Sequence, residues 1–472
     1  MSKKHSPTTG AAIAKTIVLI LVFSVSAWSS VFVRWSIPEL PPANSLGVSE
    51  IVFSWKEGIS PVLEAARKQG YRVYVEVPIR QARLAAQQAA NAGCAGVILD
   101  ASAPESTSSD SDVRNLRSTY SHLRFLTLSP KGKQPDMRGS LIIKRGSILE
   151  VSSPTAQPWI DTNLALIRVE QRSRHAEDPL YTFSWTDQGQ TRTADDYSLA
   201  VAEAGAFHGD LVLPLDEALQ RGLSRRDVEA WALWNQVRSV LRFSSDTSGG
   251  ALESAANVGV VVDHLEADDE VLNLLGRHNI PFQVFLASDL KAAELQSFDI
   301  LILLAKTDEE TAERIKSLAM RGATVVAVDA HGKFPWQSSQ PVQVNEHTTS
   351  YVVGSGKVLE FSEPVTDPET FAQDIRRLLG KSNALLSLWN GLTTIAVPYK
   401  DRRGRVIALE LVNYALEPVR VQVQLKGSFS SVRYESPEHG CCESLVPIKH
   451  DGFTEFVIPE LRIAGRVRLE SQ

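Results

Sequence analysis

Short apolar runs alternate with amphipathic segments along the first half of the chain. The apolar runs are rich in β-branched residues, and segments of helical periodicity, about ten to fifteen residues each, separate them. This alternation predicts βαβ units and a parallel sheet. Eight candidate strands between residues 47 and 245 indicate a small, degenerate (β/α)8 barrel. The candidates are Ile51–Trp55, Arg72–Pro78, Ala95–Ala101, Arg124–Ser129, Leu141–Lys144, Ile148–Ser152, Leu180–Trp185 and Asp210–Leu215.

Two other patterns follow in the second half of the chain. Residues 246–256 are rich in serine and glycine and are expected to be a linker. Residues 257–382 again alternate strand and helix patterns, as in Val258–Asp263 followed by Asp268–His278, which predicts a doubly wound, flavodoxin-like domain. Residues 383–472 carry only strand patterns and are expected to form a small all-β sandwich. The predicted fold class is therefore an α/β multidomain protein in three parts.

The N-terminal segment has the pattern of an export signal. Lysines precede an uncharged run, Thr16–Val33, and Val25-Ser26-Ala27 offers a small-residue cleavage site. Residues 1–34 are therefore expected to be a signal peptide or, if uncleaved, a membrane anchor with its N-terminus in the cytoplasm. Residues 35–46 would be a proline-rich spacer. On either alternative the body of the protein is exported, to the periplasm or the cell exterior.

Composition and motifs exclude several classes of function. The chain of 472 residues has 49 basic and 55 acidic residues, a net charge of −6 and no basic cluster, which argues against nucleic-acid binding. It has no glycine-rich phosphate-binding motif and no zinc-binding spacing of cysteine and histidine, so no cofactor or metal is expected. The adjacent Cys441 and Cys442 are compatible with a strained disulfide or with two thiols.

The candidate catalytic residues are two carboxylates at strand ends, where the chemistry of a parallel barrel gathers. Glu76 and Asp100 stand at the ends of neighbouring candidate strands. Such a pair could hydrolyse a glycosidic bond, one carboxyl protonating the leaving oxygen and the other attacking the sugar or activating water. A carboxylate at a strand end is also typical of a helix cap or an ion pair, and Glu76 could pair with Arg80.

Aromatic and polar residues near the same strand ends are candidates for substrate binding. Trp55 and Trp185 could stack on the apolar face of a sugar ring, although both could instead pack in the core. Glu150 belongs to another candidate strand. Asn163 lies at a helix start, where capping of the helix is the first expectation. The candidate substrate-binding residues are thus Trp55, Glu150, Asn163 and Trp185.

Several phrases in the second half carry a resemblance to a known type of enzyme. They are Gly322-Ala323-Thr324-Val325-Val326, the segment Pro364–Leu379, Leu388-Trp389-Asn390-Gly391, Asn413-Tyr414 and Ser436-Pro437-Glu438. With them, the sequence resembles the multidomain bacterial β-galactosidase type of glycoside hydrolase. The resemblance implies a barrel that takes a carbohydrate, a middle domain like that of class I glutamine amidotransferases through which chains could form a homo-oligomer, and a C-terminal β-domain.

The resemblance also implies catalytic residues that this chain does not show. In active barrels of that type, glutamates follow strands four and seven. The fourth and seventh candidate strands here end in Ser129-Pro130 and Ser184-Trp185, and neither offers a glutamate. We therefore expect an exported, glycoside-hydrolase-like protein that binds a carbohydrate in its barrel, with hydrolysis lost or displaced. An active glycosidase using Glu76 and Asp100, and a non-enzymatic structural envelope protein, are the alternatives.

Overall fold

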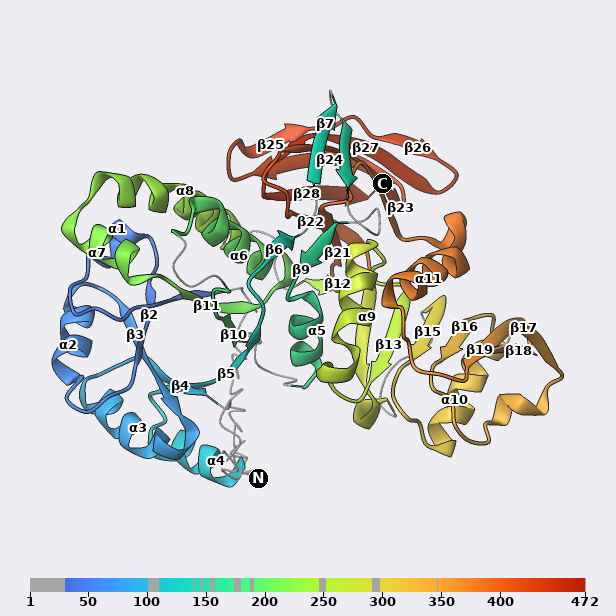
Figure 1. The fold of residues 1–472 in the computed structure, drawn as a ribbon, viewed down its shortest axis with the longest axis horizontal. Helices are drawn as coiled ribbons and strands as arrows, with labels where there is room; N and C mark the ends of the chain where they lie inside the picture. The colour runs from blue at the N-terminus through green and yellow to red at the C-terminus, as the bar shows by residue number, and fades with distance from the viewer. Residues whose placement is uncertain are drawn as a thin grey trace, which may run out of the picture.

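The structure is a computed structural model in which three parts follow one another along the chain (Figure 1). It describes residues 30–100, 110–138, 141–145, 148–152, 158–173, 180–186, 191–245, 252–290, 298–345 and 347–471. A closed barrel comes first, an open α/β sheet second, and a pair of β-sheets last. The chain is thus an α/β multidomain protein, as predicted.

Seven parallel strands close the barrel, one fewer than predicted. Around the barrel their order is β1, β11, β10, β5, β4, β3 and β2. Their bounds are β1 (Val31–Arg34), β2 (Glu50–Ser54), β3 (Arg72–Pro78), β4 (Gly96–Asp100), β5 (Arg124–Gly132), β10 (Leu180–Phe183) and β11 (Asp210–Pro214). The helices of this part are α1 (Ala43–Leu46), α2 (Ser60–Lys68), α3 (Ala82–Asn91), α4 (Asp110–Thr119), α5 (Leu164–Ser173), α6 (Ala194–Phe207), α7 (Glu217–Arg225) and α8 (Val228–Ser244).

Two of the predicted barrel strands form a separate hairpin instead. β7 (Leu141–Arg145) and β8 (Ile148–Ser152) pair antiparallel with each other and with no barrel strand. Only two residues connect them, whereas a parallel crossover needs about a dozen, so the prediction of two barrel strands here was wrong. Figure 1 shows the hairpin beside the C-terminal sheets, where β8 contacts β23 (Val419–Lys426). β6 (Asp136–Arg138) and β9 (Trp159–Asp161) form a second antiparallel pair.

The first barrel strand comes from the segment predicted to be a signal or anchor. β1 pairs in parallel with β11 on one side and with β2 on the other, and so closes the barrel. Phe32 faces the barrel interior, and Val33 packs against the surrounding helices. Trp35 and Leu46, in the predicted spacer, are also buried. The structure therefore begins the barrel at Val31 rather than at residue 47.

The rest of the export segment lies outside the described residues, which begin at Ser30. Because the uncharged run Thr16–Val33 ends inside β1, only Thr16–Ser30 of that run precede the barrel. Among the helices of the described ranges, none is long and apolar enough to cross a membrane.

Apolar side chains meet inside the barrel. Phe32 and Tyr74 meet there edge to face, with ring centroids 5.0 Å apart. The Tyr74 ring fits because residue 96 is glycine, where an added Cβ would lie 2.8 Å from the ring. The interior is a packed core rather than a channel, so any site must lie at the mouth. The apolar residues that meet in the interior are Phe32, Val52, Tyr74, Ile98, Leu126, Leu128, Leu180 and Val212.

The middle part is an open sheet with strand order β14, β13, β15, β16, β19, β18, β17. The first five strands are parallel, in an order found in doubly wound folds, and β18 and β17 extend the sheet antiparallel. The strands are β13 (Val258–Val262), β14 (Phe282–Leu286), β15 (Ile300–Leu303), β16 (Thr324–Ala327), β17 (Pro341–Asn345), β18 (Thr348–Val353) and β19 (Gly356–Phe361). The helices are α9 (Leu265–Arg277), α10 (Glu309–Met320) and α11 (Pro368–Asn383).

Two sheets form the C-terminal part, one of six strands and one of four. Alternate residues of both sheets, such as Val421 and Leu411, form one apolar core, which is the arrangement of a β-sandwich. The six-stranded sheet holds β12 (Glu253–Ser254), β21 (Thr394–Lys400), β22 (Val406–Asn413), β28 (Ala464–Ser471), β24 (Phe429–Ser436) and β25 (Gly440–Ser444). The four-stranded sheet holds β20 (Leu386–Trp389), β23, β27 (Phe453–Leu461) and β26 (Ile448–His450). β12 comes from the predicted linker.

Buried polar contacts join the three parts. Asn279, after α9, donates to the Thr394 carbonyl at 2.9 Å and accepts from the Ala396 N–H at 2.8 Å, as a neighbouring strand would. Glu203 of α6 accepts a hydrogen bond from the Tyr414 hydroxyl at 2.6 Å. One apolar cluster also runs from the barrel helices through α9 to β21 and β22. The junctions therefore belong to the core.

Candidate functional site

The candidate catalytic carboxylates lie at the mouth of the barrel. Side chains two positions apart on a strand share a face. The next interior-facing positions after the central core are therefore Arg34 on β1, Glu76 on β3 and Asp100 on β4. The structure thus brings Glu76 and Asp100 together and adds Arg34, which no sequence-based prediction had placed in the barrel.

Arg34 holds Glu76 in a bidentate ion pair. Arg34 Nε donates to Glu76 Oε2 at 2.9 Å, and Nη2 donates to Oε1 at 3.0 Å. The side chains are 25% and 14% exposed, so the pair is largely withdrawn from water. Such bidentate pairs are strong and fix both partners geometrically. The partner of Glu76 is thus Arg34, and not the sequence neighbour Arg80.

The environment of Glu76 acts on its proton affinity in opposite directions. Burial has the largest effect and raises the pKa of Glu76, the charge and hydrogen bonds of Arg34 lower it, and the charge of Asp100 raises it. On balance the pKa is raised. A raised pKa suits a general acid in glycoside hydrolysis, but here a cation occupies both carboxylate oxygens. The pair can still hydrogen-bond hydroxyl groups of a ligand, because a carboxylate accepts and a guanidinium only donates.

Two of the predicted substrate-binding residues lie away from the mouth. Val52 faces the interior, so strand alternation turns Trp55 outward to α3, where its indole N–H donates to Gln88 Oε1 at 2.9 Å. Glu150 lies on β8, opposite Ile143 in the separate hairpin, and so does not end a barrel strand.

Trp185 is a packing residue in this structure. Its indole N–H donates to the Pro214 carbonyl at 3.0 Å, and its ring lies edge to face with Phe183 and Tyr197 at 4.9 and 5.3 Å. The guanidinium carbon of Arg192 lies 4.9 Å from the ring centroid. These contacts hold Trp185 between the strand ends and α6.

Asn163 belongs to a buried network beside the barrel. Its Nδ2 donates to Glu203 Oε2 at 2.6 Å and to the Lys133 carbonyl at 2.9 Å, while its Oδ1 accepts from the Lys133 N–H at 2.7 Å. Asn163 is 1% exposed and Glu203 is fully buried. Asn163 therefore fixes the start of α5 and has no free polar group for a ligand.

Two important residues escaped sequence-based prediction. Arg34 was hidden because Val31-Phe32-Val33 continues the apolar run before it. The signal that could have revealed Arg34 is strand alternation, which puts Phe32 and Arg34 on the same face of a strand. Glu203 stands among small apolar residues in Ala200-Val201-Ala202-Glu203-Ala204, and a lone carboxylate in such a helix indicates a buried, hydrogen-bonded group.

Because β1 is a barrel strand, the fourth and seventh strands of the barrel, where the resemblance implies catalytic glutamates, must be counted again. β4 now holds that place, and it ends at Asp100. The seventh strand, β11, is followed by Asp216, whose Oδ1 accepts from the Leu219 N–H at 2.8 Å and whose Oδ2 accepts from the Tyr197 hydroxyl at 2.7 Å. Asp216 therefore caps α7. The glutamates expected from the resemblance do not stand at the ends of β4 and β11.

Cys441 and Cys442 are placed as a disulfide, which is one of the two alternatives left open by their spacing. With Glu435 they form the one group of His, Cys, Asp and Glu side chains in the described ranges close enough to share a metal ion. Cysteine binds metals as a thiolate, and a disulfide offers none.

Comparison with solved structures identifies relatives of the whole architecture. An α-L-fucosidase, isoenzyme 2 from Paenibacillus thiaminolyticus, matches with a TM-score of 0.60 and 10% identity over 95% of this chain and 100% of that chain. A cold-adapted β-galactosidase from Rahnella sp. R3 matches with 0.57 and 10% identity, over 93% and 99%. The chain has a β-galactosidase-like multidomain fold. The resemblance expected from the sequence is thereby confirmed at the level of fold.

A third solved structure of this fold, the GH42 β-galactosidase Gan42B, matches with a TM-score of 0.50 and 9% identity, over 95% of this chain and 99% of that chain. Neither protein-family models nor curated proteins match the sequence. At such low identity the β-galactosidase-like fold is shared, while the activities of these enzymes are properties of those proteins.

Proposed function

We propose that this protein is a glycoside-hydrolase-like carbohydrate-binding protein whose ligand contacts Arg34, Glu76 and Asp100 at the barrel mouth. The bidentate pair of Arg34 and Glu76, beside Asp100 at the carboxyl ends of the strands, is the observation that supports this most directly. Guanidinium and carboxylate groups in fixed positions can hydrogen-bond vicinal hydroxyls of a sugar. The position of these groups at the carboxyl ends of the strands, where barrel enzymes keep their sites, supports the proposal.

We infer that hydrolysis has been lost. A glycosidase needs one carboxyl that gives up a proton and another that attacks or activates water. Both oxygens of Glu76 are held by Arg34, so protonation of Glu76 would weaken a largely buried ion pair. The alternative is an active glycosidase that uses Glu76 and Asp100. The raised pKa of Glu76 favours that alternative.

A binding and turnover experiment separates the two. The full chain is screened on a glycan array and with chromogenic glycosides, and Asp100→Asn and Glu76→Gln are compared with Glu50→Gln. Glu50 also lies on a barrel strand and pairs with an arginine, but it lies at the opposite end of the barrel. We expect binding without turnover, weakened about tenfold or more by Asp100→Asn and Glu76→Gln and unchanged by Glu50→Gln, since one hydrogen bond to a charged group contributes about 1.5–3 kcal/mol.

Melting curves of the same variants show whether a loss of binding reflects loss of the fold. Turnover that disappears in Glu76→Gln would establish the glycosidase alternative. A folded protein that binds no glycan on the array would refute carbohydrate binding and favour the third alternative, a structural envelope protein.

We further propose that residues before β1 are a cleaved export signal. A membrane-spanning helix needs about 20 apolar residues. The run Thr16–Ser30 is shorter, because Val31–Val33 belong to the barrel. Cleavage after Ala27 would leave β1 intact. N-terminal sequencing of the protein from cell fractions tests this: a mature N-terminus near Trp28 in the exported fraction is expected, and an intact Met1 in the membrane fraction would establish an anchor.

We propose that the middle domain resembles class I glutamine amidotransferases in fold but catalyses no reaction. We also propose that chains associate with one another through this domain. The parallel strand order of the sheet and the lack of cysteine between Cys94 and Cys441 support this. Sedimentation velocity of the full chain tests the association, and a monomer at micromolar concentration would refute it.

A further inference from the structure

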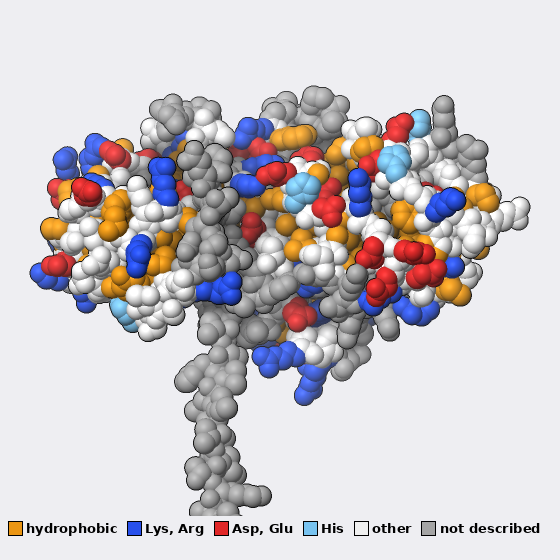
Figure 2. Space-filling model, turned by 90° about the horizontal axis from the view of Figure 1, so that it is seen from below, with side chains coloured by type: hydrophobic (Ala, Val, Ile, Leu, Met, Phe, Trp, Pro, Cys, Tyr) orange, Lys and Arg blue, Asp and Glu red, His pale blue; other side chains and the backbone are white. Residues whose placement is uncertain are grey.

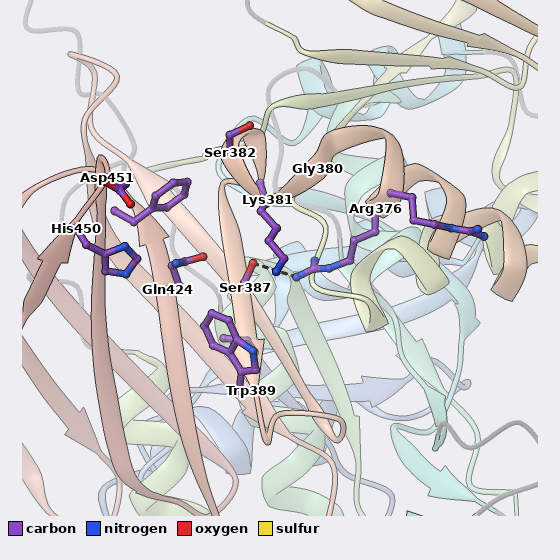
Figure 3. A pocket seen from close by; sticks show the side chains of 13 residues that line it. Arg376, Gly380, Lys381, Ser382, Ser387, Trp389, Gln424, His450 and Asp451 are labelled. Carbon is purple, nitrogen blue, oxygen red and sulfur yellow. Dashed lines mark hydrogen bonds between the residues drawn. The ribbon is translucent and has the colours of Figure 1, made fainter.

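We propose that a second site, in the groove between the end of α11 and the outer face of the four-stranded sheet, binds acidic saccharides. The groove has a volume of about 880 Å³, which is ample for a sugar unit and its neighbours. It lies in the C-terminal half of the chain, and none of its lining residues belongs to the barrel mouth. Figure 3 shows its two walls, with α11 on one side and the strands of the sheet on the other.

The sheet wall presents an exposed tryptophan. Leu386 and Leu388 of β20 face the sandwich core, so Ser387 and Trp389 face outward into the groove. Trp389 is 46% exposed, and its indole N–H has no hydrogen-bond partner among the described residues. Gln424 lies opposite Ser387 on β23 and lines the groove as well. An open aromatic face beside amide and hydroxyl groups is the surface that a sugar ring recognises.

The helix wall presents two cations, Arg376 and Lys381, that form no ion pair with the residues described by the structure. Arg376 donates to the His278 carbonyl at 2.8 Å and to Ser387 Oγ at 3.2 Å, and these partners are neutral. Lys381 is exposed and forms no ion pair within the described ranges. Both side chains reach toward the end of the groove where Ser387 lies (Figure 3). Burial lowers the pKa of Arg376, so an anion that contacts it would relieve the cost of burying the charge.

The other charged groups of the groove are placed differently. Arg377 pairs with Asp374, and His450 pairs with Glu455 at 2.8 Å. Asp451 lies with His450 at the far side of the groove in Figure 3. The end that holds Arg376 and Lys381 is therefore the anion-binding end. A carboxylate there and a sugar ring on Trp389 define the ligand as an oligosaccharide of uronic acids.

The cations of the helix wall can be explained by structural roles that need no ligand. Arg376 satisfies carbonyls at the end of α9, and Lys381 suits the negative end of a helix. These roles do not explain why Trp389 is left exposed beside two uncompensated cations. A saccharide that carries carboxylates contacts all three groups at once.

Calorimetric titration of the full chain with a tetramer of galacturonic acid tests the proposal, and its methyl ester serves as the matched neutral probe. Trp389→Ala and Lys381→Gln are compared with Trp159→Ala and Lys68→Gln. Trp159 is 51% exposed and Lys68 is exposed on α2, and neither lines the groove. We expect the acid to bind, each groove variant to weaken binding at least tenfold, and the control variants to leave it unchanged.

Binding should also weaken as salt is added, because the contacts are partly electrostatic. Equal binding of the acid and its methyl ester, no binding of the acid by a folded protein, or unaltered binding in both groove variants would each overturn the proposal. Asp100→Asn, which alters the barrel mouth, should leave this binding unchanged, so that failure at one site is distinguishable from failure at the other.

Discussion

Glu203 is a fully buried carboxylate whose two oxygens accept four hydrogen bonds. The donors are the Thr162 hydroxyl at 2.7 Å, the Asn163 N–H at 3.0 Å, the Asn163 side-chain amide at 2.6 Å and the Tyr414 hydroxyl at 2.6 Å. Burial raises the pKa of Glu203 and these four donors lower it, leaving it raised. At the residue scale this carboxylate ties a barrel helix to the C-terminal sandwich.

Replacing Glu203 by Gln should destabilise the fold. With its nitrogen in place of Oε2, the new amide would point an N–H at the Asn163 amide, which is itself a donor there, and Asn163 cannot turn over without losing its bonds to Lys133. One unsatisfied buried group costs about 1–3 kcal/mol, so we expect a loss of that size in chemical denaturation. Glu64→Gln, at an exposed position on α2, is the control. Equal denaturation midpoints for the two variants would contradict the role assigned to Glu203.

His208 should make the protein sensitive to acid. It stacks on Tyr399 with ring centroids 4.1 Å apart, and burial, with the charges of Arg168 and Arg466, lowers its pKa from 6.5 to about 3. Because the unfolded chain takes up this proton first, stability falls as the pH drops below about 6.5. Between pH 7 and pH 5 we expect a loss of about 2 kcal/mol.

His208→Asn tests this contribution, since asparagine tolerates the left-handed conformation of residue 208 (φ 58°). Denaturation at pH 7 and at pH 5 should show a smaller difference for the variant than for the wild type. The same difference in both proteins would show that other groups carry the acid sensitivity.

At the scale of elements, β1 has the greatest consequence. Its four residues close the barrel between β2 and β11 and supply the cation for Glu76. Ser30, just before it, donates its backbone N–H to Asp210 Oδ1 at 2.6 Å. Without β1 the barrel would expose two strand edges and bury an unpaired carboxylate.

A pair of truncations tests the place of β1. A chain that starts at Ser30 should fold with a cooperative melting transition, because it keeps every barrel strand. A chain that starts at Ser36 should be aggregated or lack that transition. Size-exclusion chromatography and circular dichroism distinguish the outcomes. Two equally stable, monodisperse proteins would show that β1 is dispensable.

At the scale of the whole molecule, one apolar cluster connects the three parts, and separate apolar clusters also lie inside the barrel, the middle sheet and the sandwich. The apolar cluster is continuous from the barrel helices to β22, and Asn279 and Tyr414 provide polar links across it. Asn279 has a positive φ of 51° and is 6% exposed, so both its backbone and its side chain serve the junction. Such contacts predict that the parts unfold together.

Calorimetry should therefore show one main unfolding transition for the wild type. Asn279→Ala removes two buried hydrogen bonds and places a residue with a Cβ but no polar group at positive φ. We expect it to cost about 2–4 kcal/mol and to broaden or split the transition. Tyr414→Phe removes the hydroxyl that contacts Glu203 and Thr162 at the other junction and should cost about 1–2 kcal/mol. Independent transitions already present in the wild type would show that the cluster connecting the parts does not couple their unfolding.

Local patterns were sufficient for much of the architecture. Strands such as β3, β4 and β23 follow from alternation or from apolar runs between helices, because burial on one or both faces leaves that imprint on the sequence. The order of a barrel, a parallel sheet and a β-sandwich was predicted on the same grounds. The positions of Glu76 and Asp100 at neighbouring strand ends also followed from the sequence, because adjacent parallel strands end at the same edge.

The sequence could not predict features that depend on contacts between residues far apart along the chain. Whether Val31–Arg34 is the end of an export signal or a barrel strand depends on β11, which lies about 180 residues away. Whether Trp55 faces a ligand or a helix depends on which face of β2 the closed barrel turns inward. The groove beside Trp389 exists only where α11 and the four-stranded sheet come together. Hydrophobic periodicity shows that a face is buried, and only tertiary packing decides what buries it.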